Sequence, residues 1–480
     1  MLRNLILVFA VLFCSVFAAS AAAIESPVAD TPPNVIFVLA DDLGYGDLSC
    51  FGQTKYSTPN IDALAAKGMR FTEHYSGSTV CAPSRCCLLT GYHTGHCVVR
   101  GNAEVQPEGQ EPMPTDTFTV AHLFQKGGYR TGCFGKWGLG APGSVSEPLK
   151  MGFDRFYGYN CQRIAHCYYP AFLWDDDQRQ LLIENAGSVN RTYAPKLIHK
   201  QAIDFIRQNK DQPFFMFYAA VQPHADMIAP KHYMKKHIGK YGEETPHPGG
   251  GYIAQANPRA AYAAMVNVLD DYVGDISKEL ESLDIADNTL IIFTSDNGPH
   301  VEGGNDPVYF DSNGVFKGNK RDVYEGGIHV PFIASWPKKI AAGSETDHIS
   351  AFWDFLPTIA EMIDQPLPNK LDGVSMLPTL LGKEGQQQHD YLYWEFAERG
   401  GRVAIRKGNW KGIRYNATNA PNSPLEVYDV IADPGESINL ASEHPEIASE
   451  LRVLVESART APANPRFDYK KKRKKNRQKK

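Results

Sequence analysis

Two segments of the sequence share one pattern, an apolar run followed at once by acidic or amide side chains. The runs are NVIFVLA at residues 34–40, followed by Asp41 and Asp42, and TLIIFT at residues 289–294, followed by Ser295, Asp296 and Asn297. Continuous apolar runs rich in β-branched residues predict strands buried on both faces of a parallel sheet. Ligand sites in such α/β sheets lie at the carboxyl ends of the strands. We therefore expect an α/β fold that gathers these polar side chains at one edge of its sheet.

The polar groups at the two strand ends predict a metal site. Asp41, Asp42, Asp296 and Asn297 offer hard oxygen ligands, with neither imidazole nor thiolate among them. Adjacent carboxylates repel each other unless a cation lies between them, and the alternative is that they cap neighbouring backbone. An all-oxygen set suits Ca²⁺ or Mg²⁺ better than Zn²⁺.

A second informative stretch is VCAPSRCCLLTG at residues 80–91, which is typical of a turn that feeds a short helix. The N-terminus of this helix would face Cys81, where exposed backbone N–H groups favour an anion, and Arg85 adds a forked cation one turn later. This pattern predicts a seat for a sulfate or phosphate group beside a reactive side chain. The alternative is an ordinary buried cysteine beside a solvated arginine.

The string Cys81-Ala82-Pro83-Ser84-Arg85, continued by LLTG, resembles the sulfatase signature C-x-P-S-R. The resemblance covers essentially the whole mature chain to about residue 458, and it looks more like bacterial carbohydrate sulfatases than small-aryl enzymes. It implies that a formylglycine-generating or sulfatase-maturating enzyme converts Cys81 to formylglycine, whose hydrated aldehyde is the nucleophile. It also implies one calcium ion, held by Asp41, Asp42, Asp296, Asn297 and the modified Cys81.

Two further motifs resemble those of the sulfatase family. Gly135-Lys136-Trp137 is similar to the element that carries a sulfate-binding lysine, which implies this role for Lys136. Residues 313–331 resemble the second signature, G-K-x-x-x-Y-E-G-G-x-R-x-P, and imply that Lys320 is the second sulfate-facing lysine. Lys317 is the alternative for that role. His329 stands where the signature has arginine, and we interpret it as structural.

The chain departs from the commonest family pattern at Gly138, where relatives have a histidine that is thought to contact the formylglycine hydroxyl. The candidates to replace that histidine are His96, His166 and a metal-bound Asp296. A general acid is expected elsewhere, at His224, which follows the apolar run PFFMFYAA at residues 213–220. His224 also matches the second histidine of the family's H-x-P-H element, and an imidazole titrates near neutral pH.

Substrate contacts are expected from an aromatic loop and from the segment after Asn297. Residues 157–174 combine aromatic rings with hydrogen-bonding groups, as expected of a loop that frames a sugar. The candidate sugar contacts are Gln162, Arg163, His166, His300, Asp306 and Asp311. The resemblance suggests 4-sulfated galactose or N-acetylgalactosamine as the substrate.

The resemblance implies an alkaline-phosphatase-like α/β/α sandwich with a mostly parallel central sheet. Alternating patterns after residue 390 predict a smaller C-terminal domain with an antiparallel sheet and a helix. The expected divisions are a signal peptide at 1–23, a catalytic domain at 24–381, a C-terminal subdomain at 390–460 and a disordered basic tail at 461–480. The first 23 residues have a short positive start, an apolar core too short to span a bilayer and small cleavage-site residues. We therefore expect an exported protein, periplasmic or secreted, with no membrane span.

Charge and cysteine content limit the partners. Lys470 to Lys480 holds nine of the 49 basic residues, which leaves 40 basic against 54 acidic residues in the rest of the chain. Such a basic run is usually solvated, and it is a candidate for binding polyanions such as a sulfated polymer. Nucleic acid is not an expected partner of an exported chain. Cys86 and Cys87 are expected in the core, and the candidates for pairing in an oxidising compartment are Cys50, Cys97, Cys133, Cys161 and Cys167.

The expected reaction is hydrolysis of a sulfate ester, because a transferring sulfuryl group spreads negative charge that Arg85, Lys136, Lys320 and calcium would stabilise. The substrate would be a sulfated saccharide or a small sulfate ester. Two alternatives stay open at this point. One is a phosphatase or phosphodiesterase on the same fold, and the other is a non-catalytic protein that binds sulfated polymers.

Overall fold

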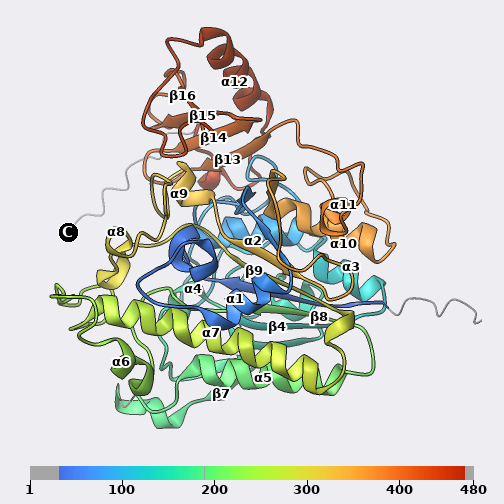
Figure 1. The fold of residues 1–480 in the computed structure, drawn as a ribbon, viewed down its shortest axis with the longest axis vertical. Helices are drawn as coiled ribbons and strands as arrows, with labels where there is room; N and C mark the ends of the chain where they lie inside the picture. The colour runs from blue at the N-terminus through green and yellow to red at the C-terminus, as the bar shows by residue number, and fades with distance from the viewer. Residues whose placement is uncertain (1–31, 189, 471–480) are drawn as a thin grey trace, which may run out of the picture. The chain divides into compact units, whose positions relative to one another are not determined.

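The computed structural model of the protein describes residues 32–188 and 190–470 and is built around one large sheet (Figure 1). Its strand order is β11-β2-β10-β9-β1-β8-β4-β5-β6-β7. In that order the strands are Ser344–Thr346, Met69–Phe71, Phe332–Ser335, Thr289–Ser295, Asn34–Ala40, Phe214–Ala219, Arg130–Lys136, Arg155–Tyr159, Phe172–Asp175 and Gln178–Leu181. The central strands β9, β1, β8, β4 and β5 pair in parallel, whereas β10 and β6 are antiparallel to their neighbours. The expected mostly parallel sheet is confirmed.

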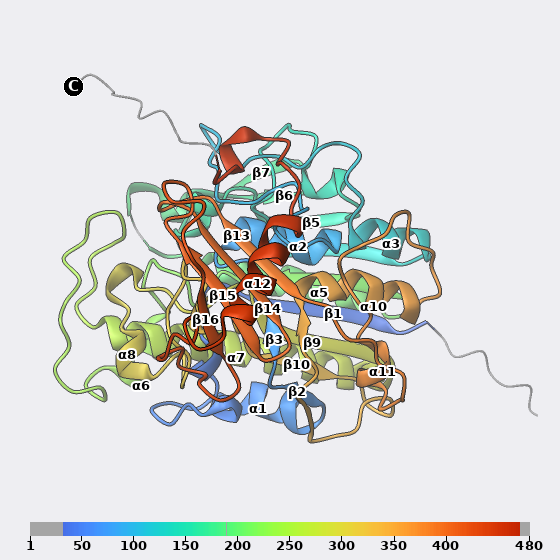
Figure 2. The same ribbon diagram turned by 90° about the horizontal axis from the view of Figure 1, so that it is seen from above.

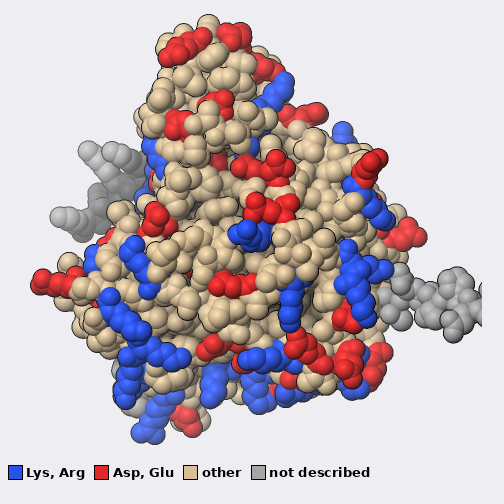
Figure 3. All heavy atoms as spheres, in the orientation of Figure 1, with Lys and Arg blue, Asp and Glu red and all other residues tan. Residues whose placement is uncertain are grey.

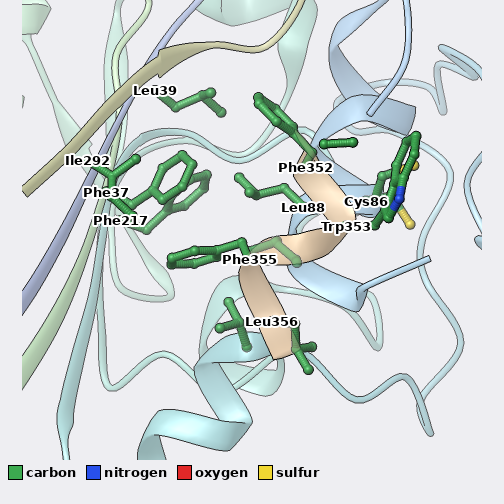
Figure 4. Packing of buried hydrophobic residues seen from close by; sticks show 14 of the residues in the cluster. Phe37, Leu39, Cys86, Leu88, Phe217, Ile292, Phe352, Trp353, Phe355 and Leu356 are labelled. Atoms are coloured by element: carbon green, nitrogen blue, oxygen red, sulfur yellow. The ribbon is translucent and has the colours of Figure 1, made fainter. Parts of the chain in front are cut away.

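Strand β1 shows how the sheet divides the hydrophobic core into two layers. All of its residues are buried, and successive residues belong alternately to two hydrophobic clusters. This follows from the strand geometry, since successive side chains point to opposite faces. In one layer the ring of Phe37 lies 6.1 Å from that of Phe217 on β8 and 4.6 Å from that of Phe355 (Figure 4).

Helices cover both faces of the sheet (Figures 1 and 2). One layer contains α2 (Cys81–Thr90), α3 (Val120–Lys126) and α10 (Phe355–Met362). The other contains α1 (Pro59–Ala66), α5 (Ala194–Asn209) and α7 (Pro258–Ser282), with α6 (Lys231–His237) packed on α7. The shorter elements are β3 (His74–Tyr75), β12 (Ser350–Ala351), α4 (Gln162–Ala165), α8 (Pro307–Phe310), α9 (Glu325–Ile328) and α11 (Leu377–Leu380). No helix in the described part of the chain is long and apolar enough to cross a bilayer.

The C-terminal part forms a separate antiparallel sheet, drawn in red in Figure 1. Its order is β13-β14-β15-β16, with strands Leu392–Phe396, Arg402–Lys407, Trp410–Tyr415 and Glu426–Asp429, and α12 (Pro445–Ser457) packs on it. This confirms the predicted strands and helix. This sheet is joined to the part of the chain that holds the large sheet through buried charges: Lys411 Nζ on β15 lies 2.7 Å from Glu325 of α9 and 3.0 Å from Glu436. Residues 33–188 and 190–470 belong to one compact unit.

The predicted tail boundary at residue 461 is wrong for its first ten residues. Pro465–Phe467 forms a turn of 3₁₀ helix, and Phe467 and Tyr469 are buried in hydrophobic clusters. Arg459 also pairs with Asp468 at 3.2 Å. These aromatic side chains anchor the segment although its composition is polar. The signal peptide at 1–23 and residues 471–480 of the basic tail lie outside the described residues.

The cysteines of the described residues are unpaired, and most of them are buried. Cys86 and Cys87 lie on α2 with no exposure to solvent, as predicted. The disulfides considered for Cys50, Cys97, Cys133, Cys161 and Cys167 are absent, because every cysteine of the described chain is free. Cys133, for example, lies inside β4 and packs in the hydrophobic core.

Candidate active site

Cys81 is the first residue of α2, directly beyond the extended residue Val80, and is buried. Gly91 ends the helix in the left-handed conformation, with φ of 75°. The Cys81 Sγ lies 3.5 Å from Asp41 Oδ1 and 3.9 Å from Asp42 Oδ1. Burial raises the pKa of the Cys81 thiol far above its ordinary value of 9.0. The unmodified side chain is therefore a thiol at neutral pH, which is a poor nucleophile.

The polar residues after β1 and β9 meet as predicted. The two strands are parallel neighbours, with Ala40 opposite Ser295. The backbone N–H of Asp42 donates to Asp296 Oδ1 at 3.1 Å, and Asn297 Nδ2 donates to Asp42 Oδ1 at 2.8 Å. Asp42 has a left-handed φ of 63°, an unfavourable conformation that the surrounding contacts hold in place.

Three buried cations pair with these carboxylates. Arg85 donates from Nε and Nη2 to Asp296 Oδ2, at 3.1 and 2.9 Å. Lys136 Nζ lies 2.9 and 2.7 Å from the two carboxylate oxygens of Asp41. Lys320 Nζ lies 2.5 Å from Asp42 Oδ2. Three carboxyl groups thus face three cations, all with little or no exposure to solvent.

The pKa values of these carboxylates diverge. Burial, followed by the charge of Asp41, raises the pKa of Asp296 from 3.8 to about 7. Burial also disfavours the charged form of Asp42, but its positive neighbours, Lys320 first among them and Lys136 further away, together outweigh burial and lower the pKa of Asp42 well below its ordinary value. A strongly perturbed carboxyl cluster at a strand edge is typical of a functional site.

His224 lies beside Lys320 at the end of β8. Its Nδ1 donates to the Ala225 carbonyl oxygen at 2.5 Å, so its Nε2 accepts from Lys320 Nζ at 3.0 Å. Burial and the charge of Lys320 lower the pKa of His224 well below 6.5. The ring is therefore neutral and forms a hydrogen-bonded pair with the ammonium. The ring of His166 stacks on it, with centroids 4.3 Å apart.

The cluster fits a hard divalent cation. Ligand atoms of Asp41, Asp42, Cys81 and His224 all lie within 4.8 Å of one another. The Oδ1 of Asn297 is buried and has no hydrogen-bond partner within residues 32–188 and 190–470. An unpaired buried amide oxygen next to carboxylates is the ligand expected for Ca²⁺ or Mg²⁺.

A cavity of about 400 Å³ opens above Cys81. Its walls include the predicted residues Gln162, Arg163, His166, His224 and Lys320. It is also lined by residues that the sequence did not reveal: Asn102, Glu104, Gln110, Gly251, Tyr252 and Arg321. These residues come from loops without periodicity, and only the charge of Glu104 and Arg321 could have marked them.

Three predicted sugar contacts do not line this cavity. His300 is buried, and its Nε2 lies 3.0 Å from the Pro223 carbonyl oxygen, so it braces the loop that carries His224. Asp306 caps α8 and pairs with Arg259 at 2.7 Å. Asp311 follows α8 and is exposed.

The remaining candidates also have structural partners. Lys317 Nζ donates to the Glu436 carbonyl oxygen at 3.0 Å, outside the cavity, so the geometry favours Lys320 over Lys317. His329 is buried between Glu325 and the Thr72 carbonyl oxygen, in line with a structural role. His96 pairs with Asp372 at 2.9 Å and does not line the cavity.

Comparison with known proteins identifies the family. The sulfatase family model matches residues 33–364, and the model described as the C-terminal region of N-sulphoglucosamine sulphohydrolase matches residues 313–460. The chain belongs to the sulfatase family. This sulfatase is 32% identical to human arylsulfatase A, over 88% of this chain and 87% of that one. It is 29% identical to an N-acetylgalactosamine-6-O-sulfatase of Bacteroides thetaiotaomicron, over 89% and 93% of the two chains. It is a sulfuric ester hydrolase, as predicted.

Solved structures agree with this assignment. Ps i-CgsB, in complex with k-i-k-neocarrahexaose, superposes with a TM-score of 0.76 at 26% identity, over 90% of this sulfatase and 94% of that chain. A phosphonate monoester hydrolase of Agrobacterium radiobacter, at 20% identity and a TM-score of 0.65, covers 89% of this sulfatase and 95% of that chain. That similarity concerns the fold alone. The expected alkaline-phosphatase-like fold is confirmed.

Proposed function

We propose that this sulfatase hydrolyses sulfate esters of carbohydrates, with Cys81 converted to formylglycine and one calcium ion beside it. The observation that carries the proposal is the position of Cys81 beneath the cavity, among three carboxylates and three buried cations. This arrangement can hold a sulfate group over residue 81 and neutralise its charge.

The surroundings of Cys81 support its modification. The thiol is held at the start of α2 with a raised pKa, so it lacks the thiolate character of a catalytic cysteine. As formylglycine, the side chain supplies a hydrated aldehyde whose first oxygen attacks sulfur and whose second oxygen expels sulfate as the aldehyde is restored. A formylglycine-generating or sulfatase-maturating enzyme would be the partner for this conversion.

The residues that would hold calcium are Asp41, Asp42, Asp296, Asn297 and the modified Cys81. Calcium supplies positive charge that polarises the attacking oxygen and the sulfate. With the ion bound, the carboxylates no longer need Lys136 and Lys320 as their partners. Both ammonium groups can then turn to the sulfate oxygens. Arg85 keeps Asp296 in place through its forked contact.

The hydrogen-bonded pair of Lys320 and His224 lies where a departing alcohol oxygen would need a proton. We assign the role of general acid to His224. Because its Nδ1–H is engaged with Ala225, Nε2 is the nitrogen that would serve: as Lys320 turns to the sulfate oxygens, Nε2 would take up a proton from solvent and pass it to the departing alcohol oxygen. The low pKa of His224 keeps the ring neutral until that proton arrives, and it makes the protonated ring a strong acid.

A sulfated saccharide is the proposed substrate class. The bacterial relative is named for N-acetylgalactosamine, and Ps i-CgsB was solved with neocarrahexaose. Gln162, Arg163 and His166 line the cavity with polar groups, and Tyr252 offers an aromatic face. We propose 4-sulfated galactose or N-acetylgalactosamine, and export to the periplasm or medium. The basic tail would bind polyanions there.

A screen tests this proposal. Purified enzyme is assayed on 4-sulfated and 6-sulfated N-acetylgalactosamine and galactose, before and after removal of metal with a chelator and readdition of Ca²⁺ or Mg²⁺. We expect turnover of at least one sulfated sugar, loss with chelation and recovery with Ca²⁺. Cys81→Ser and Lys320→Ala should both abolish turnover. Full activity of either variant would place the site elsewhere, and activity confined to aryl sulfates would contradict the sugar assignment.

A further inference from the structure

Gly138 and Gln162 compete for one space beside the reaction cavity. Gly138 has a φ of 74°, in the left-handed region that favours glycine. A Cβ atom added to Gly138 would lie 2.8 Å from Gln162 Cγ and 2.9 Å from its Nε2. The side chain of Gln162 therefore fills the space into which any side chain at position 138 would extend.

The Gln162 carboxamide is a buried donor without a partner. The residue is 5% exposed and lines the cavity together with Cys81 and Lys320. Its Nε2 has no hydrogen-bond partner in the part of the chain that the structure describes. A buried amide without a partner is unfavourable, so such a group in the cavity that holds Cys81 and Lys320 indicates a ligand oxygen as its partner.

We propose that Gln162 is a catalytic residue whose Nε2–H donates a hydrogen bond to an oxygen of the transferring sulfate group. This inference rests on the proposed function. A carboxamide neither gains nor loses a proton near neutral pH, so Gln162 stabilises developing charge without proton transfer. The proton for the leaving alcohol is assigned to His224.

Two substitutions of Gln162 test this role in the fully matured enzyme. Gln162→Met keeps the shape and removes the donor, and kcat should fall by ~100-fold while the shape of the pH profile stays unchanged. Gln162→Glu should lose more activity as pH rises, because its ionised carboxylate repels the sulfate. A merely structural residue would change the melting temperature and leave kcat and the pH profile intact.

A double-mutant cycle with Gly138 adds an independent readout. Gly138→Ala should lower kcat by displacing the Gln162 carboxamide. In a Gln162→Ala background the clash is gone, so adding Gly138→Ala should lower kcat little further. Additive losses would overturn the inference. So would Gln162→Met activity within threefold of the parent at equal aldehyde and metal content. A parent without aldehyde or metal would instead overturn the proposed function, and the inference with it.

A second cavity, of about 780 Å³, lies between the starts of α5 and α6 and the side of α7. It shares no lining residue with the reaction cavity. Its walls carry the basic residues Arg191, Lys196, Lys200 and Lys231 against a single carboxylate, Asp275. This balance contrasts with the net charge of −5 of the whole chain. Figure 3 shows basic side chains gathered around α6 on the same part of the surface.

Aromatic rings complete the walls of this cavity. Tyr169, Tyr233 and Tyr272 line it, and the ring of Tyr272 stacks on His199 at 4.1 Å. The Nδ1 of His199, which is 8% exposed, has no hydrogen-bond partner among residues 32–188 and 190–470. Tyrosine faces bind sugar rings, and lysine and arginine bind sulfate or carboxylate groups. The combination fits an anionic oligosaccharide.

We infer that this second cavity is an accessory site that holds a sulfated polysaccharide while another part of the polymer reaches Cys81. The inference rests on the proposed substrate class. The test compares Lys196→Glu/Lys231→Glu with Lys370→Glu/Lys383→Glu, which makes the same charge change at exposed lysines elsewhere. For each variant we would measure binding to immobilised chondroitin sulfate. We would also measure kcat/KM on chondroitin sulfate and on the small ester 4-nitrophenyl sulfate.

The Lys196→Glu/Lys231→Glu variant should bind chondroitin sulfate at least tenfold more weakly than the control variant, with unchanged kcat/KM on the small ester. Equal binding by the two variants would overturn the accessory site. The binding assay does not depend on turnover. A failure of the accessory site, seen as equal binding, is therefore distinct from a failure of the proposed sugar specificity, which would be seen as no turnover of any saccharide.

Discussion

Replacing Lys320 with methionine removes one cation from the reaction cavity. Lys320 Nζ lies 2.5 Å from Asp42 Oδ2 and 3.0 Å from His224 Nε2, and its side chain is almost fully buried at the wall of the cavity. At an effective dielectric constant of about 20, unit charges about 4 Å apart interact by about 4 kcal/mol. Part of this energy already stabilises the bound substrate. We therefore expect kcat to fall by ~10²–10³-fold, about 2.7–4 kcal/mol, as for the loss of one oxyanion donor.

The assay is steady-state hydrolysis of 4-nitrophenyl sulfate, with melting temperature and metal content measured in parallel. Lys317→Met is the matched control, because Lys317 lies three residues earlier and its Nζ bonds the Glu436 carbonyl oxygen outside the cavity. The control should retain kcat within threefold of the parent. The assignment would be refuted if Lys317→Met lost activity by ~100-fold while Lys320→Met remained near the parental rate.

Three further predictions concern other parts of the molecule. Arg85→Lys keeps the charge but loses the fork to Asp296, so kcat/KM in the same assay should fall at least ~10²-fold, and a parental value would contradict this. Burial lowers the pKa of His93 from 6.5 to about 3, so between these values the unfolded chain binds a proton that the folded chain does not. As the pH falls from 6.5 to 4.5, the free energy of unfolding of the parent, measured in urea, should therefore decrease by about 2–3 kcal/mol more than that of His93→Asn. Parallel pH curves for the two proteins would refute this prediction. Phe467→Ala should cost ~3–5 kcal/mol in the same unfolding assay, and an unchanged denaturant midpoint would contradict the anchoring of this segment.

The cluster of carboxylates at the edge of the sheet could be predicted because buried parallel strands are recognisable as apolar runs. Their carboxyl ends share one edge of the sheet, which brings Asp41, Asp42 and Asp296 together across 254 residues of chain. The same logic gave the helix at Cys81, since Gly91 supplies the left-handed residue that ends it. Local chemistry and periodicity were sufficient for these elements.

The choice between Lys317 and Lys320 could be predicted only from motif spacing, because both lie in an irregular loop. Their side chains diverge through a long-range contact, that of Lys317 with the Glu436 carbonyl oxygen in the C-terminal part. Tyr252 and Arg321 escaped detection for the same reason, since loops that line a cavity have no sequence period. The order of residues 461–470 was missed because two buried aromatic rings outweigh a polar composition.

The most direct test of the central claim is peptide mass spectrometry across Cys81 in enzyme produced with a sulfatase-maturating enzyme. We predict the mass of an aldehyde at residue 81, in a fraction of the molecules that rises in proportion to specific activity. Fully active enzyme that carries only the unmodified thiol at Cys81 would contradict the proposed mechanism.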